Sequence, residues 1–259
     1  MLKSLNLNES SSRLTTLSIL SYNAHGFKGI EDEIKTGESA KIVNFIENKD
    51  TDVFCIQEFS AIQYKYFSDY PYFFKTNIIA GKKKSVMAIF SKYPITNKEY
   101  ISFPNSRNGA MFVDLVLNEE KVRIYNVHLE SYKVSDISNL SNPKSGYSVL
   151  IGKIGVAERT RKEQALLLKK HINEFKGRVI ICGDFNSTQF SSSYRIIKGL
   201  KKDTFIEAGI GLGKTYEFFK YPFRLDYILV DDSFEVLSHE SFDLKYSDHE
   251  PILSKLVLN

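Results

Sequence analysis

Short apolar segments bounded by polar residues recur along most of the chain. They are rich in Ile, Val, Phe and Tyr, a composition typical of β-strands. The pattern predicts about ten strands and one weaker strand at 234–240. The stronger segments lie near residues 16–22, 52–57, 72–77, 85–90, 98–103, 111–117, 121–129, 178–183, 225–230 and 251–258.

Two longer segments, 38–49 and 158–175, place apolar residues on one face at helical spacing and predict amphipathic helices. A third, weaker helix is predicted over 191–199. The stretch 131–157 is polar, contains six Ser and has no strong periodicity. We therefore expect a long loop or a poorly packed insertion there, of the kind that often forms a substrate-binding rim.

Many strands and few helices predict an α+β fold in which two sheets pack on each other with helices outside, rather than an alternating parallel-sheet fold. No internal repeat and no Pro- or Gly-rich linker divides the chain. We expect a single domain at 16–259, preceded by an N-terminal extension at 1–15.

The composition is that of an ordinary globular protein. The chain has 259 residues, of which 42% are hydrophobic, and only two Cys, which excludes a disordered chain and a disulfide scaffold. Cys55 and Cys182 lie within apolar segments, where buried thiols are expected. No segment is apolar and long enough for a membrane span or a signal peptide, so we expect a cytoplasmic protein. A longer native form with a membrane segment is compatible with this sequence.

The net charge of +4 is too small to indicate nucleic-acid binding by itself. Two basic runs, Lys82 to Lys84 and Lys201 to Lys202, are candidates for contacts with phosphates in a track beside a site. Short charged runs more often lie in solvated loops.

Polar residues follow several of the predicted strands, at the point where each apolar run ends. Others lie at the start of the predicted strand 225–230 or just before the predicted strand 251–258. Taken singly, each has an ordinary structural role as a cap, a turn former or a hydrogen-bonded His. Their coincidence at six places favours a site, because strand ends that lie side by side converge on one rim. The residues are Asn23, Glu58, His128, Asp184, Asn186, Asp226, Asp248 and His249.

Such a rim would collect four carboxylates in one place. They could not all stay ionised at close range without a cation. Carboxylate and amide oxygens without a Cys or His cluster suit Mg²⁺ or Mn²⁺ rather than Zn²⁺. The sequence therefore predicts a hard divalent metal ion as cofactor.

The segments around these residues, taken in order, resemble the motifs of the endonuclease/exonuclease/phosphatase family from about residue 16 to 258. The resemblance implies the DNase I-like fold, a four-layer α/β sandwich of two packed mixed β-sheets flanked by helices. It also implies Mg²⁺-dependent hydrolysis of phosphoesters. The matching blocks are Ser-Tyr-Asn23, Ile-Gln-Glu58, Asn-Val-His128-Leu, Gly-Asp184-Phe-Asn186-Ser, Arg-Leu-Asp226-Tyr-Ile and Ser-Asp248-His249.

The resemblance also implies a role for each motif residue. Glu58 would be the principal Mg²⁺ ligand, with Asn23 and Asp248 nearby directly or through water. Mn²⁺ is a possible substitute. Asp226 would orient His249 as a dyad, which fixes the imidazole and stabilises its cationic form.

For the water and the phosphate, two assignments stay open. We favour Asp184 and Asn186 positioning the attacking water, with His128 and His249 gripping the phosphate. The alternative makes His249 the general base.

Three further residues in or near these motifs have weaker functional assignments. Arg161 matches an Arg often seen at that place in the family and is a candidate substrate contact, although an exposed helical Arg is the simpler interpretation. Ser187 is expected to cap the following turn, and Arg224 to hold the loop beside Asp226.

The expected substrate is a phosphodiester, with nucleic acid favoured, and we expect a monomer without an obligate protein partner. His25 and His128 occupy positions where abasic-site endonucleases generally have other residues, so that specialisation is disfavoured. A phospholipid, sphingomyelin or inositol-phosphate enzyme of the same fold is the alternative, and an apolar membrane-docking hairpin would distinguish it. A non-catalytic binding module is least favoured, because every motif is present.

Overall fold

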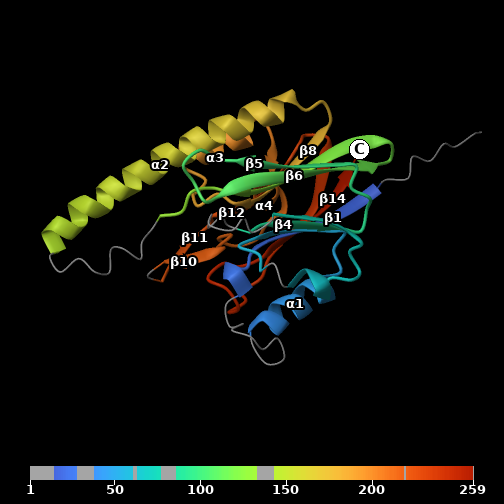
Figure 1. Ribbon diagram of the computed structural model, residues 1–259, viewed down its shortest axis with the longest axis horizontal. Helices are drawn as coiled ribbons and strands as arrows, with labels where there is room; N and C mark the ends of the chain where they lie inside the picture. The colour runs from blue at the N-terminus through green and yellow to red at the C-terminus, as the bar shows by residue number, and fades with distance from the viewer. Residues whose placement is uncertain are drawn as a thin grey trace, which may run out of the picture.

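The computed structural model describes residues 15–27, 38–60, 63–76, 86–132, 143–218 and 220–258, without the side chains of 38, 63, 64, 143–151 and 153. Two six-stranded sheets lie face to face in the centre, and helices cover their outer faces (Figure 1). The layers are therefore helix, sheet, sheet and helix, which confirms the predicted fold class.

Each sheet mixes parallel and antiparallel pairs. The first has the order β13, β14, β1, β2, β4 and β3, with bounds Phe234–Ser241, Ile252–Leu258, Thr15–Asn23, Val53–Gln57, Ala88–Ser91 and Tyr72–Lys75. The second has the order β5, β6, β7, β8, β12 and β9, with bounds Asn97–Ser102, Gly109–Leu117, Glu120–His128, Arg178–Asp184, Asp226–Val230 and Lys202–Asp203. A separate ribbon pairs β10 (Tyr216–Phe218) with β11 (Tyr221–Phe223).

The helices are unevenly shared between the two outer faces. α1 (Glu38–Lys49) covers the first sheet, whereas α2 (Pro143–Glu174) and α3 (Ser192–Lys198) cover the second (Figure 1). A short helix α4 (Thr204–Ala208) and two 3₁₀ turns, η1 (His25–Phe27) and η2 (Gln63–Tyr66), complete the described elements.

The central strands are buried on both faces. In β1, Leu17 and Ile19 point between the sheets, whereas Leu20 and Tyr22 point toward α1. The same alternation occurs in β2 and β8. Because both faces meet apolar neighbours, these strands are continuous apolar runs in the sequence. Each predicted strand, including the weaker one, has a counterpart in the structure.

The expected loop at 131–157 is wrong over its second half. α2 begins at Pro143 rather than near residue 158, and residues 133–142 lie outside the described part of the chain. The early turns of α2 extend beyond the sheets (Figure 1), and Val156 is 67% exposed. A helical segment without a core to pack on needs no apolar stripe, so its periodicity is absent from the sequence.

Two parallel pairs determine where the polar residues meet. β1 runs parallel to β2, and β7 runs parallel to β8. The carboxyl ends of both pairs therefore lie at one edge of the stack. β12 is antiparallel to β8, so that its first residue, Asp226, lies at the same edge opposite Asp184.

The boundary predicted at residue 16, between an N-terminal extension and the domain, stays a prediction. β1 begins at Thr15 and β14 ends at Leu258, whereas residues 1–14 lie outside the described part of the chain.

Among the described helices, none combines the length and the apolar character needed to cross a bilayer.

A buried polar network joins α4 to the first sheet. His239 Nδ1 lies 2.8 Å from Thr204 Oγ1 and 3.1 Å from Ser254 Oγ. Burial lowers the pKa of His239 from 6.5 to about 4. Protonation of this imidazole is therefore linked to unfolding.

We expect acid to destabilise the protein through His239. Below about pH 6.5 the unfolded chain binds a proton that the folded protein does not bind until about pH 4. This contribution to stability is complete above pH 6.5 and is lost as pH falls toward 4, by about 1.4 kcal/mol per unit. Urea unfolding of wild type and His239→Asn between pH 7 and 5 measures it, and equal pH slopes for the two proteins would contradict it.

Candidate active site

Polar side chains from both sheets converge at the edge where the parallel strands end. In the second sheet, strand pairing places His128 and Asp226 opposite Asp184, one on each side of it. In the first sheet, Asn23 is the last residue of β1, and Glu58 directly follows β2. The structure thus brings residues from distant parts of the sequence into one cluster.

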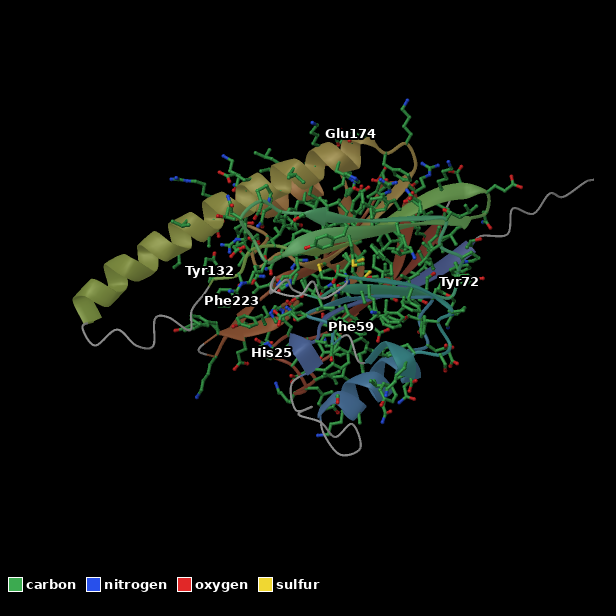
Figure 2. All side chains as sticks on the ribbon, viewed as in Figure 1. His25, Phe59, Tyr72, Tyr132, Glu174 and Phe223 are labelled. Atoms are coloured by element: carbon green, nitrogen blue, oxygen red, sulfur yellow. The ribbon has the colours of Figure 1, made fainter. Side chains whose placement is uncertain are left out.

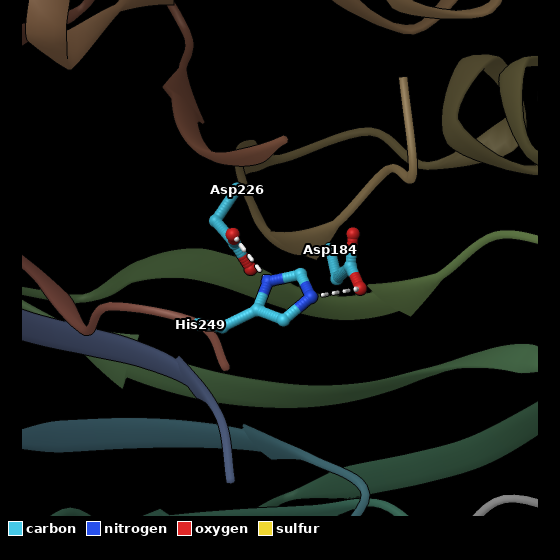
Figure 3. Close-up of side chains that lie close together, drawn as sticks. All are labelled: Asp184, Asp226 and His249. Carbon is cyan, nitrogen blue, oxygen red and sulfur yellow. Dashed lines mark hydrogen bonds and ion pairs between the residues drawn. The ribbon is translucent and has the colours of Figure 1, made fainter. Parts of the chain in front are cut away.

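His249 lies between two buried carboxylates (Figure 3). Its Nδ1 is 2.8 Å from Asp226 Oδ2, and its Nε2 is 3.6 Å from Asp184 Oδ2. Tyr216 packs against the imidazole, with ring centroids 4.8 Å apart. Since Asp184 and Asp226 are no more than 2% exposed and His249 is 5% exposed, the ring is held in one orientation.

The two imidazoles of the cluster differ in charge. Burial opposes the charged form of His249, but the carboxylates of Asp226 and Asp184 outweigh it and raise its pKa to about 10. For His128, burial dominates and lowers the pKa, although Asp184 lies 3.6 Å away. At neutral pH the cluster therefore holds one cationic and one neutral imidazole.

Asp184 is the residue that most of the cluster contacts. Its Oδ1 accepts a hydrogen bond from the backbone N–H of Asn186 at 2.7 Å. Its Oδ2 accepts from the side-chain amides of Asn23 at 3.0 Å and Asn186 at 3.2 Å. Burial raises the pKa of Asp184, which makes it a stronger base than an exposed Asp.

Three residues around the cluster have a left-handed backbone. The φ angles are 50° at Glu58, 47° at Asn186 and 46° at His25. Each residue follows a strand end and turns the chain there. Such angles are uncommon outside glycine, and strained backbone of this kind clusters at functional sites.

Gly183 allows the two parallel strands of the second sheet to meet beside the cluster. Its φ is 138°, and a Cβ atom there would lie 2.0 Å from the carbonyl oxygen of Val127. Any other residue would push β7 and β8 apart at the pair that places His128 opposite Asp184.

Glu58 and Asp248 form the more exposed half of the cluster, with side chains 36% and 45% exposed. Glu58 Oε1 is 3.9 Å from His128 Nε2. His25 Nδ1 lies 3.7 Å from Glu58 Oε2 and 3.3 Å from Asp248 Oδ1. Carboxylates that face solvent fit a divalent cation that keeps coordination positions open for substrate oxygens.

A second group of possible ligands is less suitable for a cation. Single ligand atoms of Asp184, Asp226 and His249 lie within 4.8 Å of one another. Asp226 Oδ2 is already paired with His249 Nδ1, and a His249 with a pKa of about 10 has no lone pair to offer at neutral pH. Glu58 and Asp248 are therefore the better place for a metal ion.

Sequence reasoning did not assign three residues that the structure places in or beside the cluster. His25 was visible only by its position two residues after Asn23. Tyr216 gave no signal, because its hairpin is too short for a strand pattern. Thr215 supports the turn before β12, where its Oγ1 accepts the N–H of Asp226 at 3.1 Å.

The structure corrects the expectation for Arg161. Its side chain has no exposed surface, so it is not an exposed helical Arg, and its role in substrate binding stays a prediction. It donates hydrogen bonds to Glu130 O at 2.9 Å and Glu158 Oε1 at 2.6 Å, and its guanidinium lies 3.9 Å from the Tyr132 ring centroid. Arg161 therefore fixes the segment that follows β7.

Two smaller expectations concern Arg224, which anchors the loop before Asp226 to Asp203, and Ser187, which is not the cap of α3. Arg224 donates to both carboxylate oxygens of Asp203, at 2.9 and 2.8 Å, and so holds the start of α4. The cap of α3 is Ser191, whose Oγ accepts the backbone N–H of Tyr194, rather than Ser187.

The predicted basic track beside the site is not formed by Lys201 and Lys202. Lys201 forms an ion pair with Asp231 at 2.8 Å. Lys202 pairs with Val230, at the end of β12 remote from the cluster. Lys82 to Lys84 lie outside the described residues.

Comparisons with known proteins give a family and a fold. The sequence profile of the Endonuclease/Exonuclease/phosphatase family matches residues 20–249. No curated protein sequence matches the chain.

Several solved structures share the fold at low sequence identity. One is an endonuclease/exonuclease/phosphatase family protein from Bacteroides thetaiotaomicron, with a TM-score of 0.70, 19% identity and coverage of 95% of this chain and 96% of that one. A second is D. rerio TDP2 complexed with single strand DNA product, with a TM-score of 0.69, 17% identity and coverage of 93% of this chain and 99% of that one. A third is a mannosyl-6-phosphatase from Bacteroides thetaiotaomicron, with a TM-score of 0.67, 19% identity and coverage of 93% of this chain and 100% of that one.

We expect the pKa of His249 to depend on Asp226. In wild type the imidazole should titrate near pH 10, and in Asp226→Asn the pKa should fall, because a carboxylate that raises it is removed while burial remains. Long-range ¹H–¹⁵N NMR of the ring nitrogens measures both values. A wild-type His249 that titrates at its ordinary pKa would contradict the charge assignment.

Proposed function

The chain belongs to the endonuclease/exonuclease/phosphatase family, whose members are phosphoesterase hydrolases, and we propose that it is a monomeric, divalent-metal-dependent phosphodiesterase that cleaves nucleic acid. The observation that carries this proposal is the buried His249, held between Asp226 and Asp184 (Figure 3) in the same cluster as the exposed carboxylates of Glu58 and Asp248. A fixed imidazolium opposite a cation-binding pair of carboxylates is suited to hold an anionic phosphate.

The buried half of the cluster supplies groups for the water and the phosphate. The raised pKa of Asp184 suits it to accept a proton from the attacking water, and the Asn186 amide at 3.2 Å helps to orient that water. The cationic His249, in the segment before β14, and the neutral His128, at the end of β7, both lie 3.6 Å from Asp184, and both would donate to phosphate oxygens. Asp226 keeps His249 charged and aligned.

Glu58 and Asp248 would hold the divalent cation, Mg²⁺ or Mn²⁺, with Asn23 close by. The cation would neutralise charge on the non-bridging oxygens and on the leaving oxygen. Asn23 has a second task, since its Oδ1 accepts the backbone N–H of His25 at 3.1 Å while its amide donates to Asp184. It thereby links the cation half of the cluster to the buried half.

The hairpin of β10 and β11 supports nucleic acid as the substrate. Tyr216 packs on His249, and Tyr221 on the next strand is 69% exposed. Aromatic side chains beside a phosphate site can stack on the bases of a single strand. The likeness to TDP2 complexed with a single-stranded DNA product agrees with this choice.

A lipid-directed phosphoesterase is the second candidate, and exposed apolar residues favour it. Ile206, Ile210 and Leu212 are 63%, 95% and 80% exposed, and they precede the hairpin in the chain. Exposed aliphatic residues near an aromatic hairpin are suited to a membrane surface.

The first test concerns the cation. Glu58→Gln should keep the fold and lower hydrolysis of a chromogenic phosphodiester on the order of a thousandfold, because the cation loses a charged ligand. Chelation of wild type should have the same effect, and added Mg²⁺ or Mn²⁺ should reverse it. Glu99→Gln, an exposed carboxylate change on β5, is the matched control. Wild-type activity that survives chelation would contradict the cation assignment.

The second test concerns the substrate. Tyr221→Ala should raise KM for DNA or RNA oligonucleotides roughly tenfold, since a stacked base contributes about 1–3 kcal/mol. Its kcat on a chromogenic phosphodiester without bases should not change. Tyr72→Ala is the control, because Tyr72 is also exposed and lies at the opposite end of the molecule from Phe223 (Figure 2).

The same enzyme is assayed on vesicles that contain sphingomyelin or a phosphoinositide. Turnover of the vesicles without cleavage of DNA or RNA would replace the nuclease proposal by the lipid-directed one. The assignment as a phosphoesterase would remain.

A further inference from the structure

His25 points its Nδ1 atom at both carboxylates of the exposed half. The distances are 3.7 Å to Glu58 Oε2 and 3.3 Å to Asp248 Oδ1. Among the described residues, the His25 ring makes no hydrogen bond, and the Glu58 carboxylate accepts none. Donor atoms bound to one ion at about 2.1 Å are separated by roughly 3 to 4 Å, so both distances suit a shared cation.

The backbone holds His25 in this position. Its φ of 46° lies in the left-handed region, and the next residue, Gly26, also has a positive φ of 69°. Two hydrogen bonds fix the turn: His25 N–H to Asn23 Oδ1 at 3.1 Å and Gly26 N–H to Glu58 O at 2.8 Å. The second bond ties Gly26, the residue next to His25, to Glu58, which carries the facing carboxylate.

The same turn reduces the part that Asn23 can play as a ligand. Its Oδ1 is occupied by the His25 N–H, and its amide is directed at Asp184. The imidazole nitrogen, which makes no hydrogen bond within the described part of the chain, is therefore a better third donor near Glu58 and Asp248 than the Asn23 oxygen, which has one lone pair engaged.

We propose that His25 Nδ1, together with Glu58 and Asp248, binds the divalent cation, and that the site binds Mn²⁺ more tightly than Mg²⁺. This inference rests on the proposed function, since it concerns the same cation. An imidazole ligand favours transition metals, whereas Mg²⁺ prefers a shell of oxygen atoms alone. The ion that this chain uses is then set by one residue on the turn after β1.

His25→Asn tests the proposal. Asn tolerates a left-handed backbone and offers an oxygen in place of the nitrogen, so the turn should be retained. Mn²⁺ binding to the whole chain is measured by EPR and calorimetry, Mg²⁺ binding by calorimetry, and nitrogen coordination by the ¹⁴N modulation of the bound Mn²⁺ signal. The variant should lose the ¹⁴N modulation and bind Mn²⁺ tenfold or more weakly, with little change for Mg²⁺.

Two further His variants separate the possible nitrogen ligands. His171→Asn, on α2 and hydrogen-bonded to Tyr125, should keep both the modulation and the affinity. His128→Asn tests the other imidazole near Glu58, and loss of the modulation there but not in His25→Asn would overturn the proposal.

The remaining outcomes distinguish this inference from the proposed function. Unchanged Mn²⁺ affinity and modulation in His25→Asn, with binding abolished in Glu58→Gln, would overturn the role of His25 and leave the metal-dependent enzyme standing. Absence of Mn²⁺ and Mg²⁺ binding to wild type would instead overturn both.

Discussion

Polar contacts between the two sheets at one edge of the stack fix how the sheets lie on each other. The apolar interface elsewhere is large but not directional, so it leaves the sheets free to slide by small amounts. Asn23 of the first sheet donates to Asp184 of the second at 3.0 Å, and Gln57 donates to Asn126 at 2.7 Å, both in buried positions. These contacts need one particular offset, and that offset aligns the strand ends that carry the site.

The same contacts carry an energetic cost. Asp184 and Asp226 are buried carboxylates, and Asp226 Oδ1 has no hydrogen-bond partner among the described residues. Burial of a charge is unfavourable unless it is paired, and removing one partner of such a pair costs about 3–5 kcal/mol. The cationic His249 pairs with Asp226 at 2.8 Å and compensates part of this cost. Stability and the charge state of the site therefore depend on one another.

The sequence predicted the features that burial on both faces makes visible. A strand between two apolar layers is a continuous apolar run, and the polar residue that ends it marks the exposed rim, as at Asn23 and Asp184. The early turns of α2, the strands of two or three residues and the ion pair that removes Lys201 from the site depend on tertiary position and leave no local pattern. Arg161 shows another limit, because nothing in its helical position indicated that its side chain would be fully buried.

The charges of the cluster give a reason for the cation that does not depend on the family. With Glu58, Asp184, Asp226 and Asp248 ionised, the imidazolium of His249 leaves three net negative charges at a site that must receive an anionic phosphodiester. Like charges at this range repel strongly, and the exposed half, where Glu58 and Asp248 have no cationic Lys or Arg partner among the described residues, carries the uncompensated part. The buried half is already organised by protein contacts, with His249 as its internal cation. In the proposed function, a divalent ion at the exposed half would remove most of the remaining repulsion, so that an anionic substrate would approach Asp184 more readily with both cations present.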